Sequence, residues 1–229
     1  EGAEFRPGLA REWAWSDDLR ELELTLRDDV VWHDGEAVSA GDVVWTIRAA
    51  ADPEYAYWQG QDFARLDTVY TPSPGVVVLG LSEPDAGMME ALAQLPVLPR
   101  HRLADLSPEE FGRAPFHREP VGSGPYEFVE RRTDGSILLR RSDRFPEDLG
   151  RGTLDRIVLR PIPELTSQLV ELRTGNVGAC VTEPGIASRV EDVESVRNVV
   201  SGPYGVQIIA LRVDRPPLDD VQVRRAFSA

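Results

Sequence analysis

Residues 22–47 read LELTLRDDVVWHDGEAVSAGDVVWTI, and this stretch decides the fold. Leucine alternates with a polar residue over 22–26, a period of two that predicts a half-buried β-strand. Asp34-Gly35 then predicts a turn. Ser39 is followed three positions later by Asp42, a spacing close to that of a capping box, and it predicts the start of a helix. A strand, a turn and a helix therefore follow one another within this stretch.

Outward from this stretch, the same signals predict alternating strands and helices. The predicted hairpins are 68–71 with 76–81 and 126–131 with 136–141, the helices are 88–95 and 164–173, a helical turn follows Ser107, and the other strands are 155–161, 177–181 and 206–213. Pro96 stops the first of these helices, and Gly175 terminates the second. The pattern predicts a mixed α/β (α+β) chain whose first half is rich in antiparallel strands.

The composition argues against two classes of partner. The 229 residues include 25 arginines and no lysine against 39 acidic residues, which gives a net charge of −14. A nucleic-acid-binding face needs concentrated positive charge, and so does docking on an anionic membrane surface. The longest apolar stretches, 75–81 and 206–211, are far shorter than a membrane span.

Glu1 and Ala229 both interrupt sequence that looks folded, so we expect a piece of a longer protein.

The sequence offers little support for catalysis, metal binding or a cofactor. Cys180 is the single cysteine and falls in an apolar run, which predicts an inert core residue. His33 and Asp34 are adjacent, so their side chains are expected to point apart and to serve the turn rather than one substrate. Ser123 lies in PVGSG, which fails the G-x-S-x-G pattern of a nucleophile elbow. No P-loop or dinucleotide motif occurs.

Aromatic residues crowd a polar segment just after the predicted helix stop at Asp52-Pro53. Tyr55, Tyr57 and Trp58 show neither helical nor strand spacing, and Phe63 follows them. Aromatic side chains on a loop offer a ligand a large, rigid contact area, which favours a binding pocket. They also suit a loop that is stapled onto the core, and the pattern leaves both interpretations open.

Arg100 follows Pro96-Val97-Leu98-Pro99 and is a second candidate for a binding residue. Its guanidinium group forms a planar fork that suits a ligand carboxylate. The alternative is an exposed arginine like many of the others in this chain.

Four stretches together resemble the solute-binding proteins of peptide and nickel ABC importers, the extracytoplasmic family 5. They are PGLAREW at 7–13 with LRDDVVWHDG at 26–35 and AGDVVW at 40–45, then VGSGPY at 121–126, LDRIVLR at 154–160 with LRTGNV at 172–177, and PLDDVQVRRA at 217–226. The family patterns are P-G-L-A-x-x-W, L-R-x-x-V-x-F-H-D-G, A-x-D-V, V-G-T-G-P-Y and P-F-x-D-x-R-V-R-x-A. Trp32, Gly178 and Arg212 depart from the residues that are common there.

The resemblance implies a fold like that of type II periplasmic binding proteins, with a first lobe and the entry to a second. Residues 1–205 would form most of lobe I, with an antiparallel-rich part over 1–125 and an α/β part over 126–205. Residues 206–229 would form a hinge strand and the start of lobe II.

By the same resemblance, the protein would be no enzyme but would capture a short peptide or similar solute between two lobes and deliver it to a membrane permease. Tyr55, Tyr57 and Trp58 would wall the ligand, and Arg100 would meet a carboxylate. No cofactor or metal is expected, although nickel at His33 is a weaker variant. The protein would be a monomer, periplasmic or at the cell surface, and lipid-anchored through a missing N-terminus. The alternative is the ligand-sensing domain of a cytoplasmic transcription regulator.

Overall fold

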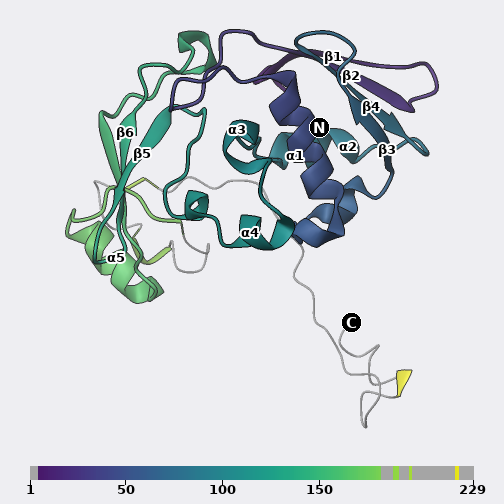
Figure 1. Ribbon diagram of the computed structural model, residues 1–229. Helices are drawn as coiled ribbons and strands as arrows, with labels where there is room; N and C mark the ends of the chain where they lie inside the picture. Colours follow the sequence, from purple (N-terminus) through teal and green to yellow (C-terminus); the bar gives the residue numbers. More distant parts are fainter. Residues whose placement is uncertain (1–4, 182–187, 191–195, 198–219, 222–229) are drawn as a thin grey trace. The chain divides into compact units, whose positions relative to one another are not determined.

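The computed structural model describes residues 5–181, 188–190, 196–197 and 220–221 (Figure 1). The chain divides into two compact units, Glu1–Pro161 and Ile162–Ala229. The predicted strand 206–213 lies outside the described residues. None of the described helices is long and apolar enough to cross a membrane.

A four-stranded antiparallel sheet dominates the first unit. Its strands are β1 (Ala10–Trp15), β2 (Glu21–Leu26), β3 (Leu66–Tyr70) and β4 (Val76–Leu81), in the order β1-β2-β4-β3. Leu22 pairs with Leu79 and Leu24 with Val77, which puts these four side chains on the same face of the sheet. The alternation predicted for 22–26 and the hairpin β3–β4 are confirmed.

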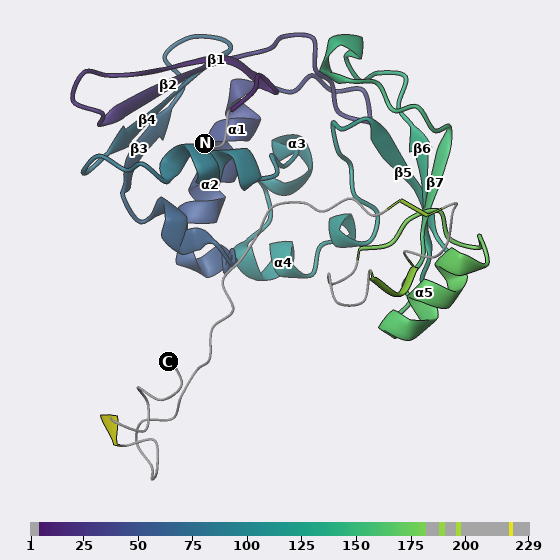
Figure 2. The same ribbon diagram turned by 180° about the vertical axis from the view of Figure 1, so that it is seen from behind.

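Helices α1 (Ala40–Ala51) and α2 (Met88–Gln94) pack against this sheet (Figure 2). The capping box of α1 is confirmed, because Ser39 Oγ accepts from the Asp42 backbone N–H and the Asp42 carboxylate accepts from the Ser39 backbone N–H at 2.8 Å. Ile47 from α1 and Met88 from α2 are almost fully buried in the core.

A second, smaller cluster lies beside the first core, where the chain turns from β2 into α1. Trp32 is 1% exposed and packs with Val30 and Val38. The short helices α3 (Arg100–Leu103) and α4 (Pro108–Gly112) follow α2 in the chain. Ser107 caps α4 with a second capping box, which confirms the helical turn predicted after it.

Three further antiparallel strands complete the first unit. They are β5 (Tyr126–Arg131), β6 (Ile137–Arg141) and β7 (Arg156–Leu159), in the order β5-β6-β7. The hairpin predicted around Asp134-Gly135 is confirmed, with Gly135 at a φ of +82°. Register shifts between Phe128 and Glu130, so Val129 forms a bulge in β5.

In the second unit, α5 (Leu165–Arg173) confirms the predicted helix, and Gly175 follows it at a φ of +76°. The predicted buried strand 177–181 is wrong: these residues form no strand, Val181 is 95% exposed, and Cys180 is only partly buried. An apolar run becomes a buried strand only where a neighbouring strand pairs with it, and none of the described residues does so here.

Candidate functional site

The aromatic segment begins where α1 ends. Asp52 Oδ1 accepts from the Glu54 backbone N–H at 2.9 Å and starts a 3₁₀ turn, η1 (Pro53–Tyr55). Ala56 then adopts a left-handed conformation with a φ of 50°, which is uncommon for a residue with a Cβ atom. A second 3₁₀ turn, η2 (Gly60–Phe63), leads into β3. Two tight turns thus hold this segment outside regular structure.

Tyr55 belongs to a group of rings from three elements. Its ring lies edge-on to Trp45 of α1, at 6.3 Å between centroids, and to Phe111 of α4, at 5.3 Å. The Phe111 ring in turn meets His117 at 5.2 Å, and His117 Nε2 donates to the Phe111 carbonyl oxygen at 2.7 Å. The sequence showed no periodicity that would join Trp45, Phe111 and His117 to this site, because tertiary contacts between elements bring them together.

Tyr57 and Trp58 lie next to each other but differ in exposure. The half-buried Tyr57 packs against the main core, and its hydroxyl donates to Gln59 Oε1 at 3.0 Å. Burial, with the nearby charge of Asp62, raises the pKa of Tyr57. Trp58 is 81% exposed, and its ring centroid is 6.3 Å from that of Tyr57. Phe63, by contrast, is 2% exposed and belongs to the core.

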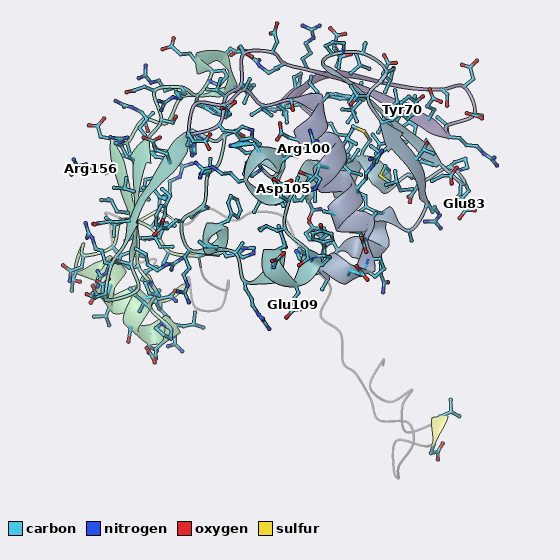
Figure 3. The ribbon with its side chains drawn as sticks, in the orientation of Figure 1. Tyr70, Glu83, Arg100, Asp105, Glu109 and Arg156 are labelled. Atoms are coloured by element: carbon cyan, nitrogen blue, oxygen red, sulfur yellow. The ribbon has the colours of Figure 1, made fainter. Side chains whose placement is uncertain are left out.

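Arg100 stands at the start of α3 with an exposed side chain (Figure 3). Its backbone N–H donates to Asp42 Oδ1 at 2.8 Å, which fixes α3 to the first turn of α1. Asp42 is 4% exposed, and its carboxylate takes part both in the capping box and in this second contact. The Arg100 guanidinium forms no ion pair with any residue that the structure describes.

The structure therefore brings together two of the four predicted site residues. The Tyr57 and Trp58 rings are in contact, whereas Tyr55 turns to Trp45 and Phe111. Among the described contacts, neither a hydrogen bond nor a ring contact joins Arg100 to the three aromatic residues. Trp58 remains as the large apolar side chain that the segment offers to solvent.

His33 and Asp34 point to different partners, as their adjacency predicted. His33 Nε2 donates to the Gly124 carbonyl oxygen at 2.9 Å, and its Nδ1 accepts from the Gly122 N–H at 3.3 Å. Both ring nitrogens are thus engaged, which leaves none for a nickel ion. No group of three or more potential metal ligands occurs among the described residues.

Asp34 Oδ2 accepts from His101 Nε2 at 2.8 Å and from the Arg102 guanidinium at 2.9 Å. Partial burial alone would raise the pKa of Asp34, but the hydrogen bonds from His101 and Arg102 outweigh it, and the pKa lies below its usual value. This cluster ties the turn after Trp32 to α3, a structural role that matches the expectation for a turn residue.

Comparison with known proteins finds similarity to bacterial solute-binding proteins. The sequence profile described as "Bacterial extracellular solute-binding proteins, family 5 Middle" matches residues 4–229. A protein of Brucella ovis described as an ABC transporter peptide-binding protein is 25% identical over 197 residues, which cover 86% of this chain and 37% of that protein. The oligopeptide-binding protein AppA of Bacillus subtilis is 29% identical over 161 residues, which cover 68% of this chain and 28% of AppA.

Solved structures show the same likeness. NikZ of Campylobacter jejuni in complex with Ni(L-His) superposes with a TM-score of 0.80 at 25% identity, over 96% of this chain and 44% of NikZ. AppA of Bacillus subtilis in complex with a nonapeptide gives a TM-score of 0.69 at 26% identity, over 74% of this chain and 34% of AppA. The expected fold class, a type II periplasmic-binding-protein fold of mixed α/β content, is confirmed. The chain spans about 37% of the length of the first curated relatives that it matches.

Proposed function

Because the chain belongs to the bacterial extracellular solute-binding proteins of family 5, we propose that it is part of the substrate-binding component of an ABC importer. The component captures a short peptide or similar solute between two lobes and delivers it to membrane permease subunits. Closure of the lobes around the ligand is a hinge motion. The Brucella relative is described as a peptide-binding protein, and AppA was solved with a nonapeptide, which favours a peptide as the ligand.

One observation carries the site: a tryptophan that is 81% exposed stands beside a half-buried tyrosine on a segment held by two tight turns. Exposing so large an apolar side chain costs free energy that ligand contact would recover. Trp58 and Tyr57 form an apolar wall for a ligand, Tyr55 supports the segment through Trp45 and Phe111, and Arg100 is available to a carboxylate.

For the lobes, we keep the division expected from the resemblance as part of the proposal. Residues 1–205 supply most of lobe I, and 206–229 supply the hinge strand and the start of lobe II. The family is extracytoplasmic. We further propose that the protein carries a lipid anchor, that it is a monomer, and that it binds its ligand without catalysing a reaction. The curated relatives named above are described as binding proteins, and neither is a transcription regulator.

Replacement of Trp58 tests the proposed site. In the intact protein, Trp58→Ala is expected to weaken peptide binding about 10-fold, the size typical of a central aromatic contact. It should leave the melting temperature nearly unchanged, because Trp58 is 81% exposed. Titration calorimetry with a peptide library, together with thermal melting, measures both effects.

Phe63→Ala is the matched control on the same segment. Phe63 is 2% exposed, so its truncation should cost about 3–5 kcal/mol of stability. If Trp58→Ala lowers stability to a similar extent and affinity holds, the aromatic segment is a staple on the core and the proposed site is wrong.

A further inference from the structure

An apolar pocket of about 320 Å³ lies in the first unit, where strands β1 and β2 face helices α1 and α2. Residues of the segment 5–9 before β1, and Leu95 and Val97 after α2, complete its lining. The volume falls within the range of about 300–1,000 Å³ that is usual for ligand sites. None of the four residues proposed for peptide binding lines this pocket, so it is a separate place in the fold.

The lining consists of a buried side and a partly covered side. Leu26 and Ile47 line the pocket from the main core, where both are buried. Trp13, Met89 and Leu92 pack against the same core but are only partly buried. Protein interiors are closely packed and leave few voids larger than a water molecule. A void lined by apolar side chains holds water poorly and binds an apolar molecule that fits it.

Two neighbouring methionines show how α2 is oriented toward the pocket. Met88 is fully buried in the core and does not line the pocket, whereas Met89 does. Leu92 and Ala93 lie on the same face of the helix as Met89, because residues three and four positions apart are neighbours on a helix surface. Ala93 is exposed, so this face reaches the opening of the pocket.

Of the described lining residues, Arg6 is the only one that carries a charge. Its side chain is exposed and forms no hydrogen bond or ion pair with any described residue. The segment that carries it is attached to the sheet, because the Leu9 carbonyl oxygen accepts from the Arg27 backbone N–H at 2.9 Å. A guanidinium group can hold a carboxylate through two parallel hydrogen bonds. Apolar walls and one unpaired guanidinium group therefore complement a molecule with an aliphatic chain and a single carboxylate.

We propose that this pocket binds a free aliphatic carboxylate of medium chain length. Its chain lies among Trp13, Met89 and Leu92, and its carboxylate meets the Arg6 guanidinium group. Removal of the chain from water supplies the favourable free energy, and the charged pair fixes the direction in which the molecule enters. The site is additional to the proposed peptide-binding function and does not depend on it.

Octanoate serves as the probe, with the intact protein labelled with carbon-13 in its methionine methyl groups. At saturation, octanoate should shift the Met89 methyl resonance several times more than that of Met88, because only Met89 lines the pocket. Met89→Leu removes one resonance and so identifies it.

A pair of arginine variants tests the charged contact. Arg6→Gln should weaken octanoate binding about 10-fold, the size typical of a lost charge-assisted hydrogen bond, and should leave binding of 1-octanol unchanged. Arg11→Gln makes the same charge change at an exposed arginine of β1 that does not line the pocket, and it should leave both affinities unchanged. Titration calorimetry measures all four affinities.

A substitution that fills the space tests the pocket itself. Ala93→Trp places a large ring at an exposed position of the lining, so it should abolish octanoate binding. The melting temperature and the affinity for peptide should stay close to those of the wild type.

Three results would overturn the proposal. The first is the absence of octanoate binding, or binding that leaves the Met89 resonance in place. The second is octanoate binding that Trp58→Ala abolishes or that saturating peptide displaces, which would put the carboxylate at the aromatic segment. The third is unfolding of Ala93→Trp together with no octanoate binding to the wild type, which would show that another part of the intact chain fills the pocket. Each of these leaves the proposed function standing, because peptide titration tests that function separately.

Discussion

At the scale of single residues, His33 and Asp34 show how neighbours in sequence can serve different contacts. The His33 ring reaches Gly122 and Gly124, about ninety positions further along the chain, and Asp34 reaches His101 and Arg102. The sequence predicted that the two side chains point apart. It could not predict their partners, because contacts over such separations depend on how whole elements pack.

The His33 contacts predict a measurable stability effect. His33→Ala removes the bonds to Gly122 and Gly124 and leaves partly buried backbone groups without partners, so it should cost about 1–3 kcal/mol. Chemical denaturation of the intact protein measures the change. His117→Ala, which removes one bond to Phe111 at an exposed site, serves as the control and should cost less.

The Asp34 contacts predict a dependence on pH. The folded state lowers the pKa of Asp34 below its ordinary value of 3.8, so the unfolded state binds the proton more readily. The stabilisation is therefore fully present well above pH 4 and is lost as pH falls through the lower, folded pKa. The difference in free energy of unfolding between the wild type and Asp34→Asn should be largest near pH 7 and shrink by pH 3. A difference that stays constant between these two pH values would contradict this role for Asp34.

At the scale of elements, a single carboxylate, that of Asp42, both caps helix α1 and connects it to α3. Asp42 closes the capping box with Ser39 and also accepts from the Arg100 backbone N–H of α3. Thr46 continues the link, because its hydroxyl accepts from the Leu98 N–H at 3.0 Å. The capping box could be predicted from the three-residue spacing between Ser39 and Asp42, whereas the contact between Asp42 and α3 could not.

Substitutions in α1 separate these tasks. Ser39→Ala should cost about 1 kcal/mol, the usual value for a lost N-cap. Asp42→Ala should cost more, because it also removes the acceptor of the Arg100 N–H in a partly buried contact. Thermal or chemical unfolding measures both. Ser107→Ala at the exposed, five-residue helix α4 is the control, and equal effects of all three would show that the contact with α3 contributes nothing.

Whether an element was predicted correctly depends on how near in the sequence the residues that signal it lie. Hairpins and helix starts depend on nearby residues, so Asp134-Gly135 and Ser107 were interpreted correctly. The strand expected over 177–181 depended on apolar composition alone, and no described strand pairs with it. Strand β1 (Ala10–Trp15) was not predicted as a strand, because its sequence AREWAW does not alternate strictly between apolar and polar residues. Its pairing with β2 decides its structure.

At the scale of the whole molecule, the boundary between the two compact units follows β7. Pairing of β7 with β6 includes residues 156–159 in the first unit, and the division falls between Pro161 and Ile162. The sequence placed subdivisions near 125 and 205 by family resemblance, and these stay predictions.

Limited proteolysis of the native protein tests this boundary. A glutamate-specific protease should cut at Glu164, just after the boundary, before it cuts at Glu127 or Glu130 within β5. Mass spectrometry of the first fragments identifies the site. Early cleavage at Glu127 or Glu130 instead would show that the three-stranded sheet is the less stable part.

The contrast between Trp32, at 1% exposure, and Trp58, at 81%, also gives the molecule an intrinsic optical reporter. An indole in water emits at longer wavelength than one in an apolar core, and a soluble quencher reaches it freely. Of the five tryptophans, Trp58 should therefore emit at the longest wavelength and be quenched most readily, and Trp32 should be the most shielded, with the partly buried Trp13, Trp15 and Trp45 between them. Contact with a solute at Trp58 would shift the spectrum to the blue and protect it from iodide, so that occupancy of the native chain can be followed without any dye.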